Sequence, residues 1–177
     1  MMLNLATPYP GFPGAFIAQS AGNDYVNACS AAFGYSNGTS SSSDGIMVVG
    51  AVGAAGMAAT PTNGGFANDF PAFSGPQPIL SGSNYGPCVE VWAPGKNILS
   101  TYSPIAYDAN NPSSWQSSSY ISYNYVNLSG TSMAAPHIAG VAAYLAETQG
   151  LNSPAAIEAA VRNRFYSLNG MNMVTLP

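Results

Sequence analysis

Three short apolar segments in the first half of the chain predict strands of a largely parallel sheet. The run Ile46–Val52 is continuously apolar and bounded by glycines, which is typical of a strand buried on both faces. Phe16–Ala21 predicts a second strand, and the alternation in Val89–Ala93 indicates a third, half-buried one. We interpret Glu90 and Lys96, within and just after this third segment, as surface charges.

The second half of the chain predicts two helices. The first begins near Ser132 and ends before Gly150, a good C-terminal capping residue, with Pro136 placed in its first turn. The second opens at Ser153-Pro154, a cap followed by a first-turn proline, and runs to about Arg164. Helices that follow buried strands predict an α/β fold. Apolar residues recur at helical spacing in the first helix, at Ala135, Ile138, Ala139, Ala142 and Leu145.

The two ends of the chain carry weaker signals. Residues 1–14 are rich in Pro and Gly and predict a loop or a poorly ordered end. Gly170–Pro177 predicts a tail with a last strand near Met173–Leu176. The length of 177 residues suits one domain with a real core.

The turn Ser129-Gly130-Thr131 and the helix that follows it offer the strongest chemical signal. Helix starts leave backbone N–H groups unpaired and partly positive, so a serine held there suits attack on a carbonyl whose oxyanion meets those N–H groups. On these grounds alone, a single serine before a helix favours the interpretation of Ser132 as an ordinary helix N-cap.

The segment Gly130-Thr131-Ser132-Met133-Ala134-Ala135-Pro136-His137 resembles the nucleophile motif of the subtilisin-like serine proteases, the subtilases. The resemblance implies that Ser132 is the nucleophile of a serine endopeptidase that forms an acyl-enzyme with a peptide or protein substrate. Ser20-Ala21-Gly22-Asn23 resembles the segment that carries the oxyanion-hole asparagine, which implies that role for Asn23 over a turn asparagine. It also implies substrate-binding positions at Ser20, Ala21, Gly22, Thr131 and Met133.

The resemblance covers Phe16 to about Phe165 and treats residues 1–177 as a partial subtilase catalytic domain. It implies a subtilisin-like three-layer α/β/α fold with a mostly parallel sheet, present as an incomplete C-terminal portion. It also implies a hairpin in Tyr102–Tyr125, lengthened at Ala106–Ser119, and an insertion in Gly53–Ser83.

The general base is the missing part of this assignment. The single histidine, His137, lies about 7.5 Å along an ideal helix and about 140° around it from Ser132, out of easy reach. In the family the catalytic histidine and aspartate lie in His-Gly-Thr and Asp-Ser/Thr-Gly segments, which this sequence does not contain. We therefore expect an N-terminal half that carries both residues and a secretion signal, and an inactive isolated chain. A nicked fragment, a truncated gene product and a degenerate homologue all remain open.

The amino-acid composition limits which binding partners are compatible with the chain. Three Lys and Arg residues against seven Asp and Glu give a net charge of −4, which argues against nucleic acid and anionic membranes. No apolar run reaches the roughly 20 residues of a membrane-spanning helix. We predict no metal site; a structural calcium ion stays open, because one loop carboxylate, Asp69, is too few of the 6–8 oxygens that calcium takes. The sequon Asn127-Leu-Ser129 abuts the nucleophile motif and is expected to be buried.

Cys29 and Cys88 lack metal-ligand spacing, so they form either a disulfide or two buried thiols. Their surroundings resemble a cysteine pair of secreted proteinase K-like subtilases, which favours the bridge and an extracellular location.

Besides the endopeptidase, two other functions fit: an inactive pseudoprotease remnant that binds peptides or proteins, and a Ser/Tyr-rich surface protein. The last fits composition but leaves the ordered motifs unexplained.

Overall fold

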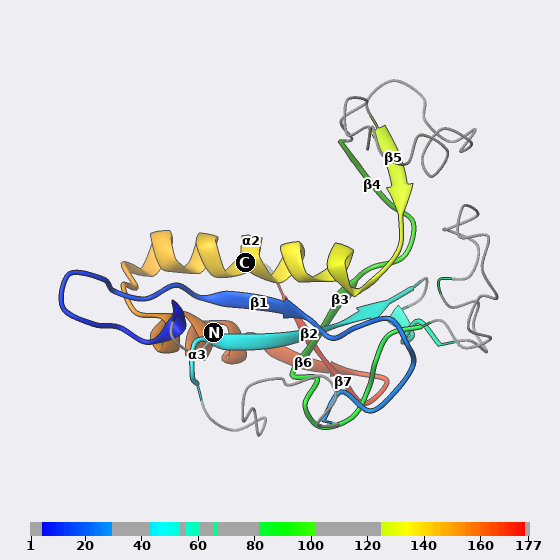
Figure 1. The fold of residues 1–177 in the computed structure, drawn as a ribbon, viewed down its shortest axis with the longest axis horizontal. Helices are drawn as coiled ribbons and strands as arrows, with labels where there is room; N and C mark the ends of the chain where they lie inside the picture. Colours follow the sequence, from blue (N-terminus) through cyan, green and yellow to red (C-terminus); the bar gives the residue numbers. More distant parts are fainter. Residues whose placement is uncertain are drawn as a thin grey trace, which may run out of the picture.

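The computed structural model describes residues 5–29, 43–53, 56–60, 66, 82–101 and 125–175. Its central sheet has three parallel strands in the order β1 (Ile17–Ser20), β2 (Ile46–Val52) and β3 (Val91–Pro94). The register sets Ser20 of β1 beside Val49, and Val49 beside Val91 of β3. The predicted α/β fold with a mostly parallel sheet is therefore confirmed (Figure 1).

Strand β2 lies at the centre of the core because both of its faces are covered. All seven of its residues are buried. Met47, Val49 and Ala51 face the helical side, while Val48 and Val52 belong to a second apolar cluster on the opposite face. An apolar run without alternation is the expected sequence of such a strand.

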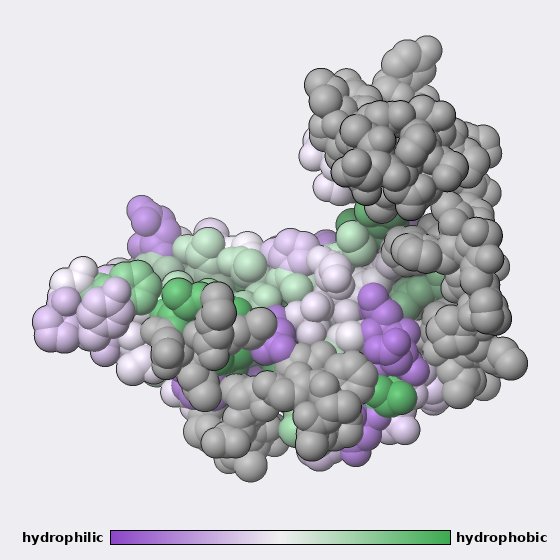
Figure 2. Space-filling view, in the orientation of Figure 1, coloured by the Kyte–Doolittle hydropathy of each residue, from purple (hydrophilic) through white to green (hydrophobic). Residues whose placement is uncertain are grey.

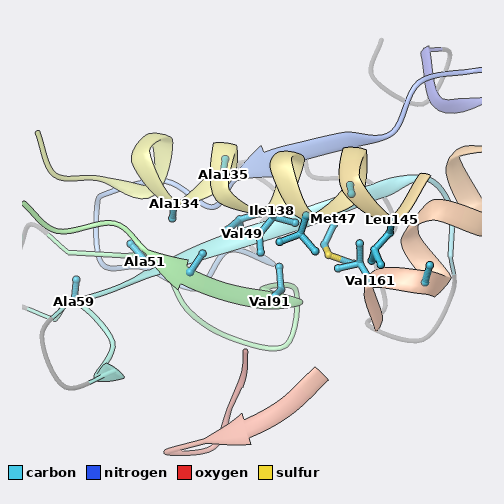
Figure 3. Packing of buried hydrophobic residues seen from close by; sticks show 14 of the residues in the cluster. Met47, Val49, Ala51, Ala59, Val91, Ala134, Ala135, Ile138, Leu145 and Val161 are labelled. Atoms are coloured by element: carbon cyan, nitrogen blue, oxygen red, sulfur yellow. The ribbon is translucent and has the colours of Figure 1, made fainter. Parts of the chain in front are cut away.

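Two helices form the layer on one face of the sheet. Helix α2 (Thr131–Gln149) lies along β1 and β2, and α3 (Pro154–Arg162) packs against α2 (Figure 1). Gly150 ends α2 in the left-handed conformation at φ 65°, and the Ser153 side chain accepts from the Ala156 N–H at 3.3 Å. Both capping predictions are confirmed. Figure 3 shows the packed side chains, which include Met47, Val49, Ala51, Val91, Ala134, Ala135, Ile138, Leu145 and Val161.

A C-terminal hairpin covers the other face of the sheet. Strands β6 (Phe165–Leu168) and β7 (Met171–Val174) pair antiparallel around Asn169-Gly170, whose φ values of 52° and 78° suit a two-residue hairpin turn. Met171 and Met173 pack with Trp92 of β3. The predicted half-buried third strand is thus wrong: Val91, Trp92 and Ala93 are all buried, because this hairpin covers the face that was expected to meet water.

A second hairpin delivers the chain to the start of α2. Strands β4 (Ile98–Thr101) and β5 (Tyr125–Leu128) pair antiparallel and project from the sheet beside that helix end (Figure 1). The expected lengthening at 106–119, and most of the expected insertion in 53–83, lie outside the described residues. Residues 5–14 form an irregular loop whose Ala6 is buried and whose Gly14 lies close to Pro154.

Candidate active site

Ser132 is the second residue of α2, and its side chain is exposed. The N-cap is Gly130, so the interpretation of Ser132 as a helix cap is wrong. Among the described residues, the backbone N–H of Ser132 has no hydrogen-bond partner. This N–H is therefore a donor at the positive end of the helix that is left for a ligand.

The turn before Ser132 depends on two glycines that approach each other closely. Gly130 has φ 151°, and its N–H donates to the Gly95 carbonyl at 2.7 Å. A Cβ at Gly95 would lie 2.6 Å from the Ala51 Cβ and 2.8 Å from the Gly130 oxygen. The end of β3 thus holds the turn against the sheet at a distance that a larger residue would not permit.

Asn23 reaches the start of α2 from the loop that follows β1. Its Oδ1 accepts from both the backbone N–H and the Oγ1 hydroxyl of Thr131, each at 2.9 Å, across 108 positions. The Thr131 hydroxyl in turn accepts from the Gly22 N–H at 3.1 Å. Asn23 therefore supplies from a distant segment the cap that Gly130 lacks.

These bonds also orient the Asn23 amide. A backbone N–H can only donate, so the oxygen of the amide must face Thr131 and the Nδ2 group must point elsewhere. Nδ2 has no hydrogen bond among the described residues, and it lies 3.3 Å from the position that a Cβ on Gly130 would take. The structure thus brings two uncommitted donors to one turn, Asn23 Nδ2 and the Ser132 N–H; their joint role as an oxyanion hole stays a prediction.

The structure places the other predicted site residues around the same helix start. Ser20 and Gly22 are partly buried at the end of β1, and Met133 is partly buried in α2. Ala21 and Thr131 are fully buried. Thr131 joins Gly22 and Asn23 through its hydroxyl, whereas the Ala21 side chain packs in the second apolar cluster. A direct contact of any of the five with substrate stays a prediction.

His137 does not act on Ser132 in this structure. Its exposed ring has Nδ1 2.9 Å from the Met133 carbonyl oxygen, one turn back along the helix.

The predicted placement of Pro136 in the first turn of the helix is wrong, because α2 begins at Thr131 and Pro136 lies inside it. Since proline has no N–H, the Ser132 carbonyl lacks the usual helical donor from four residues on.

The predicted disulfide between Cys29 and Cys88 is present, with 5.3 Å between the two Cα atoms. It joins the end of the Asn23 loop to the segment that enters β3.

The predicted burial of the sequon Asn127-Leu-Ser129 is wrong for its asparagine, because Asn127 is exposed on β5. Ser129, two residues on, is buried, and its Oγ accepts from the Asn97 N–H at 2.8 Å. Ser129 lies just beyond the end of β5, in the turn that leads into α2, so it does not share the exposed position of Asn127 on the strand.

A buried charge cluster lies beneath the sheet and was missed in the sequence. Arg162 on α3 donates through Nε to Glu158 Oε1 at 2.8 Å and also contacts Glu90. The remaining carboxylate oxygens accept from backbone N–H groups, Glu158 from Gly45 at 2.7 Å and Glu90 from Val48 at 2.8 Å. Glu90 is 2% exposed, so its interpretation as a surface charge is wrong.

Burial dominates the electrostatics of this cluster. It raises the pKa of Glu90 from 4.5 to about 7, against the Val48 N–H and Arg162, which both lower it. Burial also raises the pKa of Glu158, against the same guanidinium and the Gly45 N–H. The sequence did hold a signal: Glu158 lies four residues after Pro154 and three before Val161, on the buried face of α3.

No group of three or more potential metal-ligating side chains occurs in the part of the chain that the structure describes, and Asp69 lies outside it. Within that same part, no helix combines the length and apolar character needed to cross a membrane.

Comparison with known proteins gives consistent matches. A family model described as the subtilase family matches residues 11–174. An alkaline extracellular protease of Yarrowia lipolytica is 36% identical over 149 residues, which are 84% of this chain and 25% of that protein. Subtilisin-like protease 5 of Trichophyton tonsurans is also 36% identical over 149 residues, with coverage of 84% and 26%.

Among solved structures, a cold-adapted subtilisin-like serine proteinase aligns with a TM-score of 0.46 at 25% identity, over 87% of this chain and 42% of that one. The chain thus spans about a quarter of the length of the two curated relatives.

Proposed function

Because the chain belongs to the subtilase family, we propose that it is the nucleophile-bearing part of a secreted serine endopeptidase. The observation that carries the proposal is the bonding of Asn23 Oδ1 to Thr131, which leaves the Asn23 Nδ2 donor close to Gly130, in the turn that precedes the exposed Ser132. Secretion is supported by the disulfide and by the Yarrowia relative, which is named as extracellular.

The proposed chemistry proceeds through an acyl-enzyme. Ser132 Oγ attacks the scissile carbonyl while its proton passes to a histidine base. The Ser132 N–H and Asn23 Nδ2 donate to the oxyanion of the tetrahedral intermediate. The intermediate then expels the amine, which takes the proton from the histidine, and water hydrolyses the ester to free the acid and Ser132.

The base and its orienting aspartate are proposed to come from an N-terminal half of the same catalytic domain. β1 is an edge strand of the described sheet, with all four residues only partly buried, and its open edge suits another parallel strand. Much of the outer surface of α2 is pale green or white in Figure 2, although polar residues are exposed on it as well, at His137, Tyr144, Glu147, Thr148 and Gln149. Its exposed positions include Pro136, Ala139, Gly140 and Ala143. A helix with apolar residues on both faces is normally covered on both.

A fusion protein tests this proposal. The chain is joined behind a subtilase segment that contains the Asp-Ser/Thr-Gly and His-Gly-Thr motifs, and labelling by a fluorophosphonate probe is timed for both proteins. We expect slow or no labelling of the chain alone, since an unassisted serine hydroxyl is a weak nucleophile, and rapid labelling of the fusion at Ser132. Changing the added histidine to alanine is the control.

Two results would count against the endopeptidase. Rapid, stoichiometric labelling of the chain alone would reveal a base within these residues. A folded fusion that binds peptide without cleaving it would favour the alternative function, an inactive remnant that binds peptides or proteins.

The variant Asn23→Asp separates the capping role of Asn23 from its proposed catalytic role. Aspartate keeps the Oδ1 acceptor for Thr131 but replaces the Nδ2 donor by a negatively charged oxygen. We expect kcat of the fusion to fall by about 10²–10³-fold, with little change in KM or melting temperature. Asn152→Ala, at an exposed asparagine between α2 and α3, is the matched control. Unchanged kcat in Asn23→Asp would remove the oxyanion assignment.

A further inference from the structure

The segment Gly82–Tyr85 lies alongside the loop that carries Asn23 and pairs with its backbone. The Gly82 N–H donates to the Asn23 carbonyl and the Gly82 carbonyl accepts from the Tyr25 N–H, both at 3.1 Å. Further along, Tyr85 donates to Val26 at 3.0 Å. These contacts form isolated parallel bridges outside the sheet, so the loop has a second strand-like neighbour.

The side chain of Asn84 lies within this pairing and bonds to one loop alone. It is 0% exposed. Its Oδ1 accepts from the backbone N–H groups of Asp24 and Val26, each at 3.1 Å, and its Nδ2 donates to the Ala21 carbonyl at 2.8 Å. Its own backbone N–H donates to the Gly22 carbonyl at 2.8 Å. Asn84 thus holds backbone groups on both sides of Asn23.

The conformation of the loop explains why such a grip is needed. Tyr25, between the two N–H groups that share Oδ1, has φ 52°, a left-handed conformation that is costly for a residue with a bulky side chain. A single buried acceptor for the Asp24 and Val26 N–H groups holds this turn closed. Without it, both N–H groups and the Ala21 carbonyl would lose buried partners, and the turn at Tyr25 would relax.

We propose that Asn84 is a positioning residue for Asn23, setting the aim of its Nδ2 without itself touching substrate. The proposal rests on the proposed protease function. Asn23 must keep Oδ1 on Thr131 for Nδ2 to face the nucleophile turn, and the loop backbone that Asn84 holds fixes where Asn23 starts. Functional groups must be held within about 0.5 Å, and a misplacement of about 1 Å can cost on the order of 10²-fold in rate.

The test compares Asn84→Ala with Ser83→Ala in the fused protease. Ser83 is the matched control because it is also buried and its side chain makes no bond to the Asn23 loop. Its Oγ accepts from the Ala51 N–H of β2 at 3.0 Å and donates to the Asn84 carbonyl at 2.9 Å, but Ser83→Ala leaves the Asn84 side chain in place. We expect both variants to melt at lower temperature, but only Asn84→Ala to lose kcat, by about 10²-fold with KM nearly constant.

A double-mutant cycle with Asn23 distinguishes positioning from general weakening. In a protein that already carries Asn23→Ala, adding Asn84→Ala should lower kcat by less than about 3-fold, since the group that it aims is gone. Equal losses in both backgrounds, unchanged kcat, or a matching loss in Ser83→Ala would each overturn the proposal.

Hydrogen exchange keeps this test independent of the protease activity. In Asn84→Ala, we expect exchange of the Asp24 and Val26 amides to become faster while the amides of β2 keep their protection. If the fusion has no Ser132-dependent activity, the proposed function fails, and this exchange pattern still decides whether Asn84 holds the loop. Unchanged exchange at Asp24 and Val26 would overturn the positioning role.

Discussion

Replacing Ser132 with alanine is expected to lower kcat of the fused protease by a factor on the order of 10⁶ while leaving its melting temperature nearly unchanged. The side chain is exposed and makes no hydrogen bond among the described residues, so folding loses no contact there. Alanine also suits the second position of a helix. Steady-state kinetics with a peptide substrate and a thermal melt of the same samples check both parts.

Ser153→Ala is the matched control, because it should show the reverse pattern. Ser153 caps α3 through its Oγ, which accepts from the Ala156 N–H. Losing that cap costs about 1 kcal/mol of stability but leaves catalysis untouched. Residual activity above about 1% in Ser132→Ala would mean that another residue is the nucleophile.

Replacing Arg162 with methionine is expected to lower the free energy of unfolding by about 3–5 kcal/mol at pH 8. The guanidinium is the positive partner of both Glu90 and Glu158, which are buried under the sheet. Its removal leaves two negative charges in an interior that solvates them poorly. Denaturant unfolding of the fused protein measures the loss, and Arg164→Met, two residues beyond the end of α3 and partly exposed, is the control.

The cost of Arg162→Met should depend on pH with a defined sign. Burial raises the pKa of Glu90 from 4.5 to about 7 and raises that of Glu158, so the folded state holds protons more tightly than the unfolded state. Stability therefore falls as pH rises from about 4.5 to about 7. Without Arg162 the fall is steeper, since the attraction that lowers both pKa values is gone, and nearby Asp44 adds repulsion. A cost at pH 5 equal to that at pH 8 would contradict this account.

Helices and strands that depend mainly on neighbouring residues were well predicted from the sequence. The segment Ile46–Val52 became β2 with the predicted bounds, because a strand buried on both faces needs an apolar residue at every position. Gly150 and Ser153 ended and began their helices as predicted, since capping depends on neighbouring residues. The C-terminal hairpin was missed, although Asn169-Gly170 is a strong hairpin turn signal.

In the candidate site, too, the local motifs were predictable from the sequence and the long-range contacts were not. The motif around Ser132 and the segment ending in Asn23 are readable as sequence, because their resemblance to subtilase segments is local. Nothing in either segment predicts that the Asn23 oxygen faces Thr131, which depends on a loop that Asn84 holds from 61 positions away. Nothing local to the third strand predicts that the C-terminal hairpin covers its second face, so Glu90 just before it was misassigned to the surface.

The sequence by itself determined the central strand β2, both helices and the family, and it predicts Ser132 as the nucleophile and Asn23 as the oxyanion donor. Tertiary structure alone decided three things: that Gly130 and not Ser132 begins the helix, that Asn23 caps it, and that Glu90 joins Glu158 and Arg162 inside the protein. The physical reason is the separation along the chain over which each interaction acts. Periodicity, caps and turns act over a few residues, whereas burial and the direction of an amide depend on whichever distant segment packs against them.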